Sequence, residues 1–294
     1  MQNMVHIIES ILVYAIVLGS LYLLVSLGFS LICGVLGIFN LGYGATFLVA
    51  IYGMWMFMAT FGLSLWPAIV CVFVLQFLFT LGVIYFPIVK RYIEKEELLL
   101  TSLLLMSLIV EETVNHFYPI TAGVDIPTAI FTGTMQIGST NIPTQMLVVV
   151  IAAFLVTALY VLFLLKTKIG FKIRAISQNS EAAKLLGVRL ERIYPLAMIL
   201  AVIPPTICML VIAPVWAIEP MMGASLLQTA ILVTILGGLG NLRGTIIASF
   251  IVGLIASVVA FAGNPRLVGM AILIVVFFVL IYKPQGIAKS ETLW

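Results

Sequence analysis

The sequence has very little charge for its length. Lys, Arg, Asp and Glu together make up 9% of its 294 residues, and 63% of the residues are hydrophobic. A soluble domain carries about 25% charged residues, so this composition indicates an integral membrane protein. The net charge of +3 does not indicate a nucleic-acid partner, because half of the basic residues are concentrated in one loop between apolar segments.

Residues that commonly carry catalysis or bind metals are also scarce. The three cysteines, Cys33, Cys71 and Cys208, lie in apolar segments without metal-ligand spacing, and the two histidines are far apart in the sequence. There is no G-x-x-x-x-G-K-[ST] loop for ATP and no G-x-S-x-G nucleophile motif. We therefore expect no enzyme activity, no metal site and no cofactor held by this chain.

Carboxylates are almost absent from the apolar segments. Glu111 and Glu112, beside the end of a predicted span, are the only acids near membrane depth. A carboxylate inside a membrane suggests a function by default, but an interfacial pair facing water also fits the sequence. A proton-coupled pump would be expected to have a chain of such groups.

Long apolar runs are what the sequence has instead. A span requires about 20 apolar residues, and the runs predict an all-α membrane helix bundle of about eight to nine spans, with broken helices, as a single transmembrane domain over residues 1–294. The predicted spans are residues 7–33, 45–60, 65–89, 98–110, 144–165, 194–213, 224–236, 245–262 and 267–282. We expect the N-terminus outside and the C-terminus in the cytoplasm. The first ten residues contain no Lys or Arg, so no cleavable signal peptide is expected.

Glycine and proline interrupt several of these runs. Residues 34–44 (GVLGIFNLGYG) are rich in glycine, so the region up to residue 60 is also compatible with half-helices. Pro204 and Pro205 lie inside a span and are expected to kink or break it. Residues 111–143 contain no Lys or Arg and are expected to form an external loop with a re-entrant or strand-like piece.

The longest polar run, residues 166–192, is flanked by strongly apolar segments. It contains seven of the fourteen basic residues and only two acids, Glu181 and Glu191. Short loops rich in Lys and Arg stay on the cytoplasmic side of a membrane. The run therefore predicts a cytoplasmic loop and sets the orientation of the chain.

A short helix is predicted inside this loop. Asn179 suits the N-cap position and Glu181 suits the first turn. Residues 182–186 favour a helix, and Gly187 suits its end. A helix of about two turns is marginal alone in water, and its Leu185–Leu186 pair would be exposed unless a partner covers it. Either the helix docks onto a cytoplasmic partner, or the loop only sets the topology and lies on anionic lipid.

One predicted span carries a stripe of small residues. Thr245, Ser249, Gly253 and Ser257 recur at every fourth position. Small residues on one face allow membrane helices to approach closely. The stripe predicts a helix–helix contact, within the chain in preference to one with a second subunit.

Two glycine-rich stretches, residues 37–53 and 238–253, resemble each other. Both begin with G-x-x-N-L, and further glycines follow at similar spacings. Matching interruptions of this kind in two halves point to a transporter core. About six predicted spans separate the copies, which makes them parallel, whereas an inverted repeat needs an odd number. A chance match therefore stays open.

Four pieces of the sequence resemble one family, in the same order along the chain. They are GIFNLGYG at residues 37–44, RAISQNSEAAKLLGV at residues 174–188, the segment from EPMMG at residues 219–223 to GGLGNLRG at residues 237–244, and KPQGI at residues 283–287. Together they resemble the permeases of ABC transporters for branched-chain amino acids, of the LivH and LivM type. Each piece alone would be weak, but the combination covers nearly the whole chain.

The resemblance implies partners and a location. It implies two cytoplasmic ATPase subunits that bind the ATP, a second permease subunit (homologous or identical), an extracytoplasmic solute-binding protein, and the cytoplasmic (inner) membrane of a prokaryote. In that family the loop at residues 166–192 is the coupling element that docks on the ATPase. The implied ATPase-coupling residues are Arg174, Ser177, Asn179, Glu181, Ala182, Ala183, Leu185, Leu186 and Gly187. The implied pathway or broken-helix residues are Asn40, Tyr43, Gly44, Glu111, Gln228, Gly238, Gly240 and Asn241.

Three positions depart from the family pattern. Tyr43 stands where the family often has His, Gln228 where many members have Lys, and Glu111 where Gln is common. These departures leave the solute open among branched-chain amino acids, urea, short amides and other small polar solutes. A stand-alone secondary transporter or channel that uses Glu111 or Glu112 for ion coupling also stays open. A polytopic scaffold or enzyme is disfavoured, because the catalytic groups of an enzyme are missing.

Overall fold

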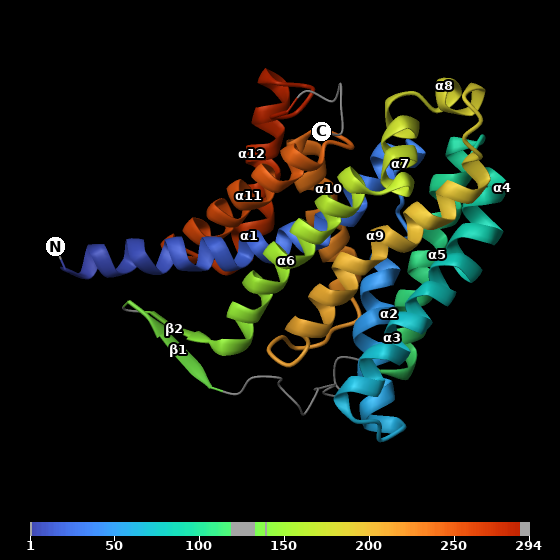
Figure 1. Cartoon of the computed structure of the whole chain (residues 1–294). Coiled ribbons are helices and arrows are strands. Elements are labelled where there is room, and N and C mark those ends of the chain that lie inside the picture. Colours follow the sequence, from blue (N-terminus) through green and yellow to red (C-terminus); the bar gives the residue numbers. More distant parts are fainter. Residues whose placement is uncertain (1, 119–132, 139, 289–294) are drawn as a thin grey trace.

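The computed structural model describes residues 2–118, 133–138 and 140–288 (Figure 1). Its elements, in chain order, are α1 (Gln2–Leu36), α2 (Tyr43–Trp55), the π-helical η1 (Met56–Thr60), α3 (Leu65–Phe79), the π-helical η2 (Thr80–Val89), α4 (Lys90–Tyr92), α5 (Glu96–Phe117), strands β1 (Thr134–Ile137) and β2 (Thr140–Pro143), α6 (Thr144–Lys166), α7 (Lys168–Gln178), α8 (Ser180–Leu185), α9 (Leu190–Ile212), α10 (Met222–Gly237), α11 (Leu242–Ala262), the 3₁₀ turn η4 (Pro265–Leu267) and α12 (Val268–Tyr282).

Seven helical segments in the described part of the chain are long and apolar enough to cross a membrane. The apolar helix α10 is shorter, at 16 residues, and α5 has 22 residues with two glutamates in its first turn. With α5 and α10 included, the long helices correspond to the nine predicted apolar segments. The predicted all-α polytopic membrane bundle is confirmed.

The bundle packs around α1, which crosses it in Figure 1. α1 contacts α6, α9, α10 and α11. Leu24, Val25 and Phe29 of α1 have no exposed surface. Ser20, Ser26 and Ser30 of α1 are buried as well, and such small residues let neighbouring helices approach α1 closely.

The small-residue stripe of α11 faces α1. The Thr245 hydroxyl donates a hydrogen bond to the Ser30 hydroxyl over 2.9 Å. A Cβ atom added to Gly253 would collide with the backbone nitrogen and Cα of Gly19. The two helices therefore meet backbone to backbone, and the predicted contact within the chain is confirmed.

A non-helical linker, residues 37–42, separates α1 from α2. Gly37 opens the linker with a φ of 69°, in the left-handed region that glycine adopts without steric cost. Tyr43, Ala45 and Phe47, in the first turns of α2, have no exposed surface. α2 therefore begins inside the protein, and the interruption predicted from the glycines is present.

α5 is longer than the sequence suggested. Its predicted span ended near residue 110, with Glu111 and Glu112 placed in an external loop, but the helix continues to Phe117. Glutamate is a good helix former, so two acids after an apolar run do not end a helix. The strand-like piece expected further on is confirmed as the antiparallel pair β1–β2. Residues 119–132 of the expected loop lie outside the described residues.

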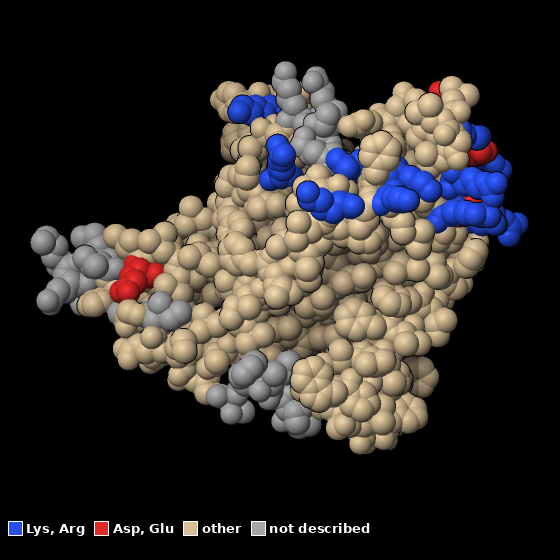
Figure 2. Space-filling model, in the orientation of Figure 1, with Lys and Arg blue, Asp and Glu red and all other residues tan. Residues whose placement is uncertain are grey.

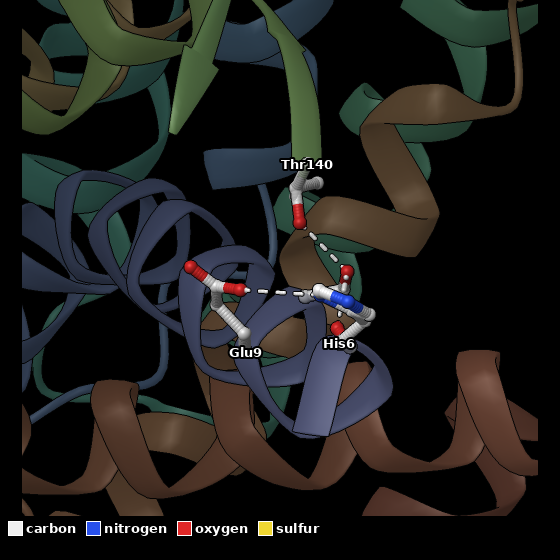
Figure 3. A network of polar contacts seen from close by, with 4 residues as sticks. His6, Glu9 and Thr140 are labelled. Carbon is white, nitrogen blue, oxygen red and sulfur yellow. Dashed lines mark hydrogen bonds and ion pairs between the residues drawn. The ribbon is translucent and has the colours of Figure 1, made fainter. Parts of the chain in front are cut away.

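The strand pair is attached to the first turns of α1. The hydroxyls of Ser10 and Thr140 lie 2.6 Å apart, and His6 Nδ1 lies 4.0 Å from Glu9 Oε2 one turn away (Figure 3). β2 contacts both α1 and α6. These contacts hold the beginnings of α1 and α6 together at one end of the bundle.

Of the kink or break predicted at Pro204 and Pro205, the break does not occur, because α9 continues through both residues. A proline in a helix lacks the N–H that would bond the carbonyl four residues earlier, so Pro205 leaves the carbonyl of Ala201 without its helix partner. The Tyr43 hydroxyl of α2 donates to this carbonyl over 3.1 Å. A side chain of another helix thus takes the place of the missing helix bond.

The close contact between α1 and α11 makes Gly253 sensitive to a single methyl group. We expect Gly253→Ala to lower the free energy of unfolding by about 1–3 kcal/mol, the usual cost of overpacking, measured by thermal unfolding of the detergent-purified protein. Gly269→Ala on α12 is the matched control, because a Cβ there meets nothing within 4 Å. Equal melting temperatures for the two variants would contradict the backbone contact.

Candidate functional site

Basic side chains gather at one end of the molecule, which we call the basic end (Figure 2). It carries the polar run at residues 166–192, now folded as α7, α8 and the start of α9. Figure 1 shows α8 at this end, outside the packed helices. The basic end is therefore the part of the molecule where a partner outside the membrane can reach α8.

α8 has a well-formed N-terminus. The Asn179 side chain accepts a hydrogen bond from the Ala182 N–H over 2.9 Å, and Glu181 places a negative charge in the first turn, where the helix dipole favours it. The cap predicted from the sequence is confirmed. It gives a helix of six residues a fixed start that its length alone would not supply.

The C-terminus of α8 is closed equally well. Gly187 has a φ of 85°, its N–H bonds the Lys184 carbonyl, and the Val188 N–H bonds the Ala183 carbonyl, both over 3.0 Å. This pair of bonds is the Schellman motif, which satisfies the last carbonyls of a helix and favours glycine at the left-handed position. The predicted stop at Gly187 is confirmed.

The apolar pair on α8 points away from the chain. Leu185 is 89% exposed and Leu186 is 85% exposed, whereas Ala183 is 2% exposed. α8 is thus fixed to the protein by one face and presents two leucines on the other. Burying a leucine is worth about 1.5–3 kcal/mol, so this pair can contribute strongly to a contact.

α7 forms where the sequence was expected to be an irregular loop. The Thr167 hydroxyl caps it by accepting from the Gly170 N–H over 2.9 Å, and Ile173 and Ile176 are buried. A cap followed by apolar residues three apart is a helix signal, and it could have revealed α7. Lysines and an arginine between the apolar residues hid the pattern.

The remaining predicted coupling residues lie on α7. The Arg174 guanidinium donates to the Leu165 carbonyl over 3.4 Å and lies 5.9 Å from the centre of the Phe171 ring. The Ser177 hydroxyl donates to the Arg174 carbonyl over 2.8 Å. Arg174 therefore ties α7 to the end of α6, one helix away from the exposed leucines, whereas the Ser177 bond stays within α7.

Two basic hollows lie beside α8. They have volumes of about 580 and 190 Å³ and share Gly187, Arg189 and Arg192. Lys184 lines the larger hollow with Glu191, and Lys172 lines the smaller one. Positive charge therefore surrounds the base of α8. A partner that covers the two leucines would complement this charge if acidic residues bordered its binding surface.

A second part of the candidate site is buried in the bundle. The Tyr43 hydroxyl and the Ala201 carbonyl meet against Gly28 of α1, where an added Cβ would collide with both atoms. Tyr43 also packs edge-on against Phe29 and Phe47, with ring centres 5.6 and 5.2 Å apart. This junction ties α1, α2 and α9 together at the point where α2 begins.

Asn40 lies in the linker just before this junction. It is 1% exposed, and neither Oδ1 nor Nδ2 has a hydrogen-bond partner among the described residues. A buried amide without hydrogen-bond partners destabilises the folded state. Such a group in a native protein therefore calls for an explanation, and a role in function is one. Among the predicted pathway residues, Asn40 has the clearest sign of a role beyond packing.

α2 is flanked by α5 and α10, which carry other predicted pathway residues. Gly44 lies against Gly223 of α10, where an added Cβ would come within 3.1 Å of the Gly223 carbonyl oxygen and 3.3 Å of Ser107 Oγ on α5. Glu111 follows Ser107 by one turn and is partly exposed, and Gln228 on α10 is exposed. Ser107 and Gly223 were missed in the sequence, because only their contact with Gly44 singles them out.

Gly238, Gly240 and Asn241 form a separate group at the basic end. The Asn241 side chain caps α11 by accepting from the Gly244 N–H over 3.0 Å. A Cβ on Gly240, whose φ is 75°, would lie 2.6 Å from the Cα of Gly34 at the end of α1. These residues shape the turn between α10 and α11, and the structure does not bring them beside Asn40.

The K-P-Q-G-I segment, residues 283–287, lies near the end of the described chain and contacts the C-terminal end of α10. The Ile287 N–H bonds the Leu236 carbonyl over 2.8 Å, and the Ala288 N–H bonds the Gly237 carbonyl over 3.3 Å. Both acceptors lie at the C-terminal end of α10, where carbonyls lack helix partners. The chain after α12 therefore closes the end of α10.

The comparison with known families decides between the remaining classes. The model of the family described as "Branched-chain amino acid transport system / permease component" matches residues 11–281. This chain belongs to that family. The resemblance seen in the four sequence pieces is confirmed, and the chain is a multi-pass permease of the inner membrane.

Curated relatives match over nearly their full length. The LivH high-affinity branched-chain amino acid permeases of Salmonella typhimurium and of Escherichia coli K12 are each 24% identical over 92% of this chain and 92% of theirs. Permeases of this family work with ATPase and substrate-binding partners in general, and the family is not an enzyme family.

Two solved structures resemble the chain loosely. PsaBC from Streptococcus pneumoniae, in complex with Fab, has a TM-score of 0.47 and 17% identity, covering 97% of this chain and 93% of that one. A metal-chelate type ABC transporter in an inward-facing conformation has a TM-score of 0.48 and 16% identity, covering 94% and 87%.

The junction at Tyr43 predicts that one hydroxyl supports three helices of this permease. We expect Tyr43→Phe to lower the free energy of unfolding by about 1–3 kcal/mol, because the Ala201 carbonyl would lose its donor. Thermal unfolding of the purified protein measures this change. Tyr52→Phe is the control, since the buried Tyr52 hydroxyl has no partner in the described part of the chain. A loss of similar size in both variants would count against the proposed bond.

Proposed function

We propose that this chain is the permease subunit of an ABC importer for branched-chain amino acids or a similar small polar solute. The observation that carries the proposal is α8, a helix capped at both ends that presents Leu185 and Leu186 at the basic end of a permease of this family. A transporter that works alone has no need of such a surface. The relatives named above, which are branched-chain amino acid permeases, support the solute class.

The basic end faces the cytoplasm in this proposal, because loops rich in Lys and Arg stay on that side. The C-terminus is then cytoplasmic and the N-terminus external. One of two cytoplasmic ATPases docks a groove over α8 of this chain, with apolar contact to the leucine pair and an acidic rim facing Arg189 and Arg192, and the other docks on the second permease subunit. ATP is bound and hydrolysed on those subunits, and this chain supplies no covalent chemistry.

The solute pathway runs along the face formed by α5, α2 and α10. Gln228 and Glu111 place polar atoms at membrane depth on the surface of the chain, where polar groups face protein or water in preference to lipid. A second permease subunit, identical or homologous, covers this face. The pathway then lies between the subunits, with a solute-binding protein at the external end.

Alternating access uses the strained position of Asn40. Its amide has no hydrogen-bond partner among the described residues, and it gains one when the start of α2 becomes accessible to the solute. A solute can shift two packings only through a difference in its interactions with them, and an unpaired amide supplies such a difference. Glu111 and Glu112 then line or border the pathway without coupling an ion.

The leucine pair of α8 provides the first test. We expect the double variant Leu185→Asp, Leu186→Asp to insert normally but to lose solute-stimulated ATP hydrolysis and uptake in proteoliposomes, because charge on both side chains opposes burial against a partner. The matched control is Leu239→Asp, which changes a leucine that is 42% exposed in the turn between α10 and α11.

A pull-down of the tagged wild-type chain in mild detergent separates the classes of transporter. Co-purification of an ATPase with a Walker motif, lost in the double variant and kept in the control, supports docking at α8. Recovery of the chain alone, with uptake driven by an ion gradient, would instead identify a secondary transporter and direct attention to Glu111 and Glu112.

The two asparagines of the glycine-rich stretches provide the second test. We expect Asn40→Leu to leave the melting temperature unchanged or raised, since no hydrogen bond is lost, while the rate of uptake falls. Asn241→Leu should behave in the opposite way. It removes the cap of α11, which costs about 1 kcal/mol of stability, and should affect uptake only through that loss.

The pair of variants separates a pathway role from a structural one. Uptake at the wild-type rate by the Asn40→Leu protein, at equal amounts in the membrane, would show that the amide has no part in transport. A large loss of stability on the same change would show that Asn40 has a structural partner.

A further inference from the structure

A groove on the outer surface of the bundle lies between α6 and α9. It has a volume of about 510 Å³ and is lined by apolar side chains, with Thr167 at one end. α6 lines it with residues from Val156 to Phe163, and α9 lines it with residues from Leu200 to Ile207. The groove therefore runs along the helices from the middle of the bundle to the end of α6.

The length of the groove matches one leaflet of a membrane. Eleven residues separate Val156 from Thr167, which is about 16 Å along an α-helix. Half of the hydrocarbon core of a bilayer is about 15 Å thick. An occupant that follows the groove thus spans the hydrocarbon of the leaflet on the basic side.

Basic residues stand where the groove reaches the surface. Lys166 and Lys168 flank Thr167 in the sequence, and both are exposed. The following helix, α7, exposes Phe171 (65%) beside Lys172, a combination typical of a helix that lies in the headgroup region. Positive charge at this depth attracts anionic headgroups, at about 1 kcal/mol for each Lys or Arg.

We propose that this groove binds one anionic phospholipid of the cytoplasmic leaflet. One acyl chain lies between α6 and α9, along Val156 to Phe163, and the phosphate group contacts Lys166 and Lys168. The bound lipid then touches the start of α7, so that the helices next to α8 rest on an ordered lipid. The orientation rests on the proposed function, but the apolar groove and its basic rim do not.

Photo-crosslinking tests the site directly. The purified chain is placed in phosphatidylcholine vesicles with a small fraction of phosphatidylglycerol that carries a diazirine on one acyl chain, and adducts are located by mass spectrometry. We expect adducts to concentrate in residues 156–163 and 200–207. Unlabelled phosphatidylglycerol should compete more strongly than unlabelled phosphatidylcholine.

Two pairs of variants isolate the headgroup from the groove. Neutralising Lys166 and Lys168 to Gln should weaken labelling about fivefold for each lysine, whereas Lys283→Gln, at the same end but after α12, should not. Filling the groove with Ile203→Trp should abolish the adducts, whereas Ile274→Trp on the exposed face of α12 should not.

Three outcomes would overturn the proposal. Labelling spread equally over α12 and the groove would show ordinary lipid contact without a site. Equal competition by the two lipids would remove the role of the lysines. Efficient disulfide crosslinking between copies carrying Leu159→Cys would show that the groove is covered by a second permease subunit. Because the crosslinking needs no ATPase, its failure leaves the proposed transport function unaffected.

Discussion

The hydrocarbon core of a membrane provides no water to a free carbonyl, so every break in a helix must be closed by the protein itself. Three of the places in the described residues where a helix is interrupted or ends show how its carbonyls are satisfied, in the bundle and at the basic end. Pro205 frees the Ala201 carbonyl and Tyr43 donates to it. α10 ends at the basic end of the molecule. There the backbone that follows α12 donates hydrogen bonds to the last carbonyls of α10. α8 ends at Gly187 with both bonds of a Schellman motif. At each place a residue far away, or a glycine with a positive φ, makes the irregular backbone possible.

The close packing around α1 follows from the same constraint. In a lipid environment helices associate through van der Waals contact and hydrogen bonds, because apolar side chains gain little by leaving lipid tails. Gly19 and Gly253 let α1 and α11 approach until their backbones touch, and the Thr245–Ser30 bond lies in the same interface. Gly28 similarly leaves room for the bond between Tyr43 and Ala201. Small residues therefore mark the places where α1 receives its neighbours, and α1 becomes the fixed centre of the bundle.

The sequence predicted those parts of the structure that depend on interactions between residues close together in the chain. The apolar runs gave the bundle, and Asn179 and Gly187 gave both ends of α8. The predictions failed where the local structure depends on a contact with a residue far away in the sequence. Pro204 and Pro205 indicated a kink or break in α9, but α9 continues, and the donor that bonds the Ala201 carbonyl lies on α2, 158 positions away. Glu111 and Glu112 suggested a loop because acids are rare at membrane depth, yet a helix can continue through them to the surface. Asn40 stood out in the sequence, but only the structure shows that its amide is buried without a hydrogen-bond partner among the described residues.

The positions of α8 and Tyr43 suggest how the two parts of the proposed site communicate. Val188, three residues after the end of α8, packs against the main core, and α9 begins two residues later. Ala201 lies eleven residues into α9, about 17 Å from its start. A displacement of α8 by an ATPase would therefore act first on α9, and α9 carries the carbonyl that Tyr43 bonds at the start of α2. Tyr43 is separated from the unpaired amide of Asn40 by two residues. In the proposed function, the bond that compensates for a proline also links α9, which follows the docking helix, to the start of α2, so the same hydroxyl would serve both stability and coupling.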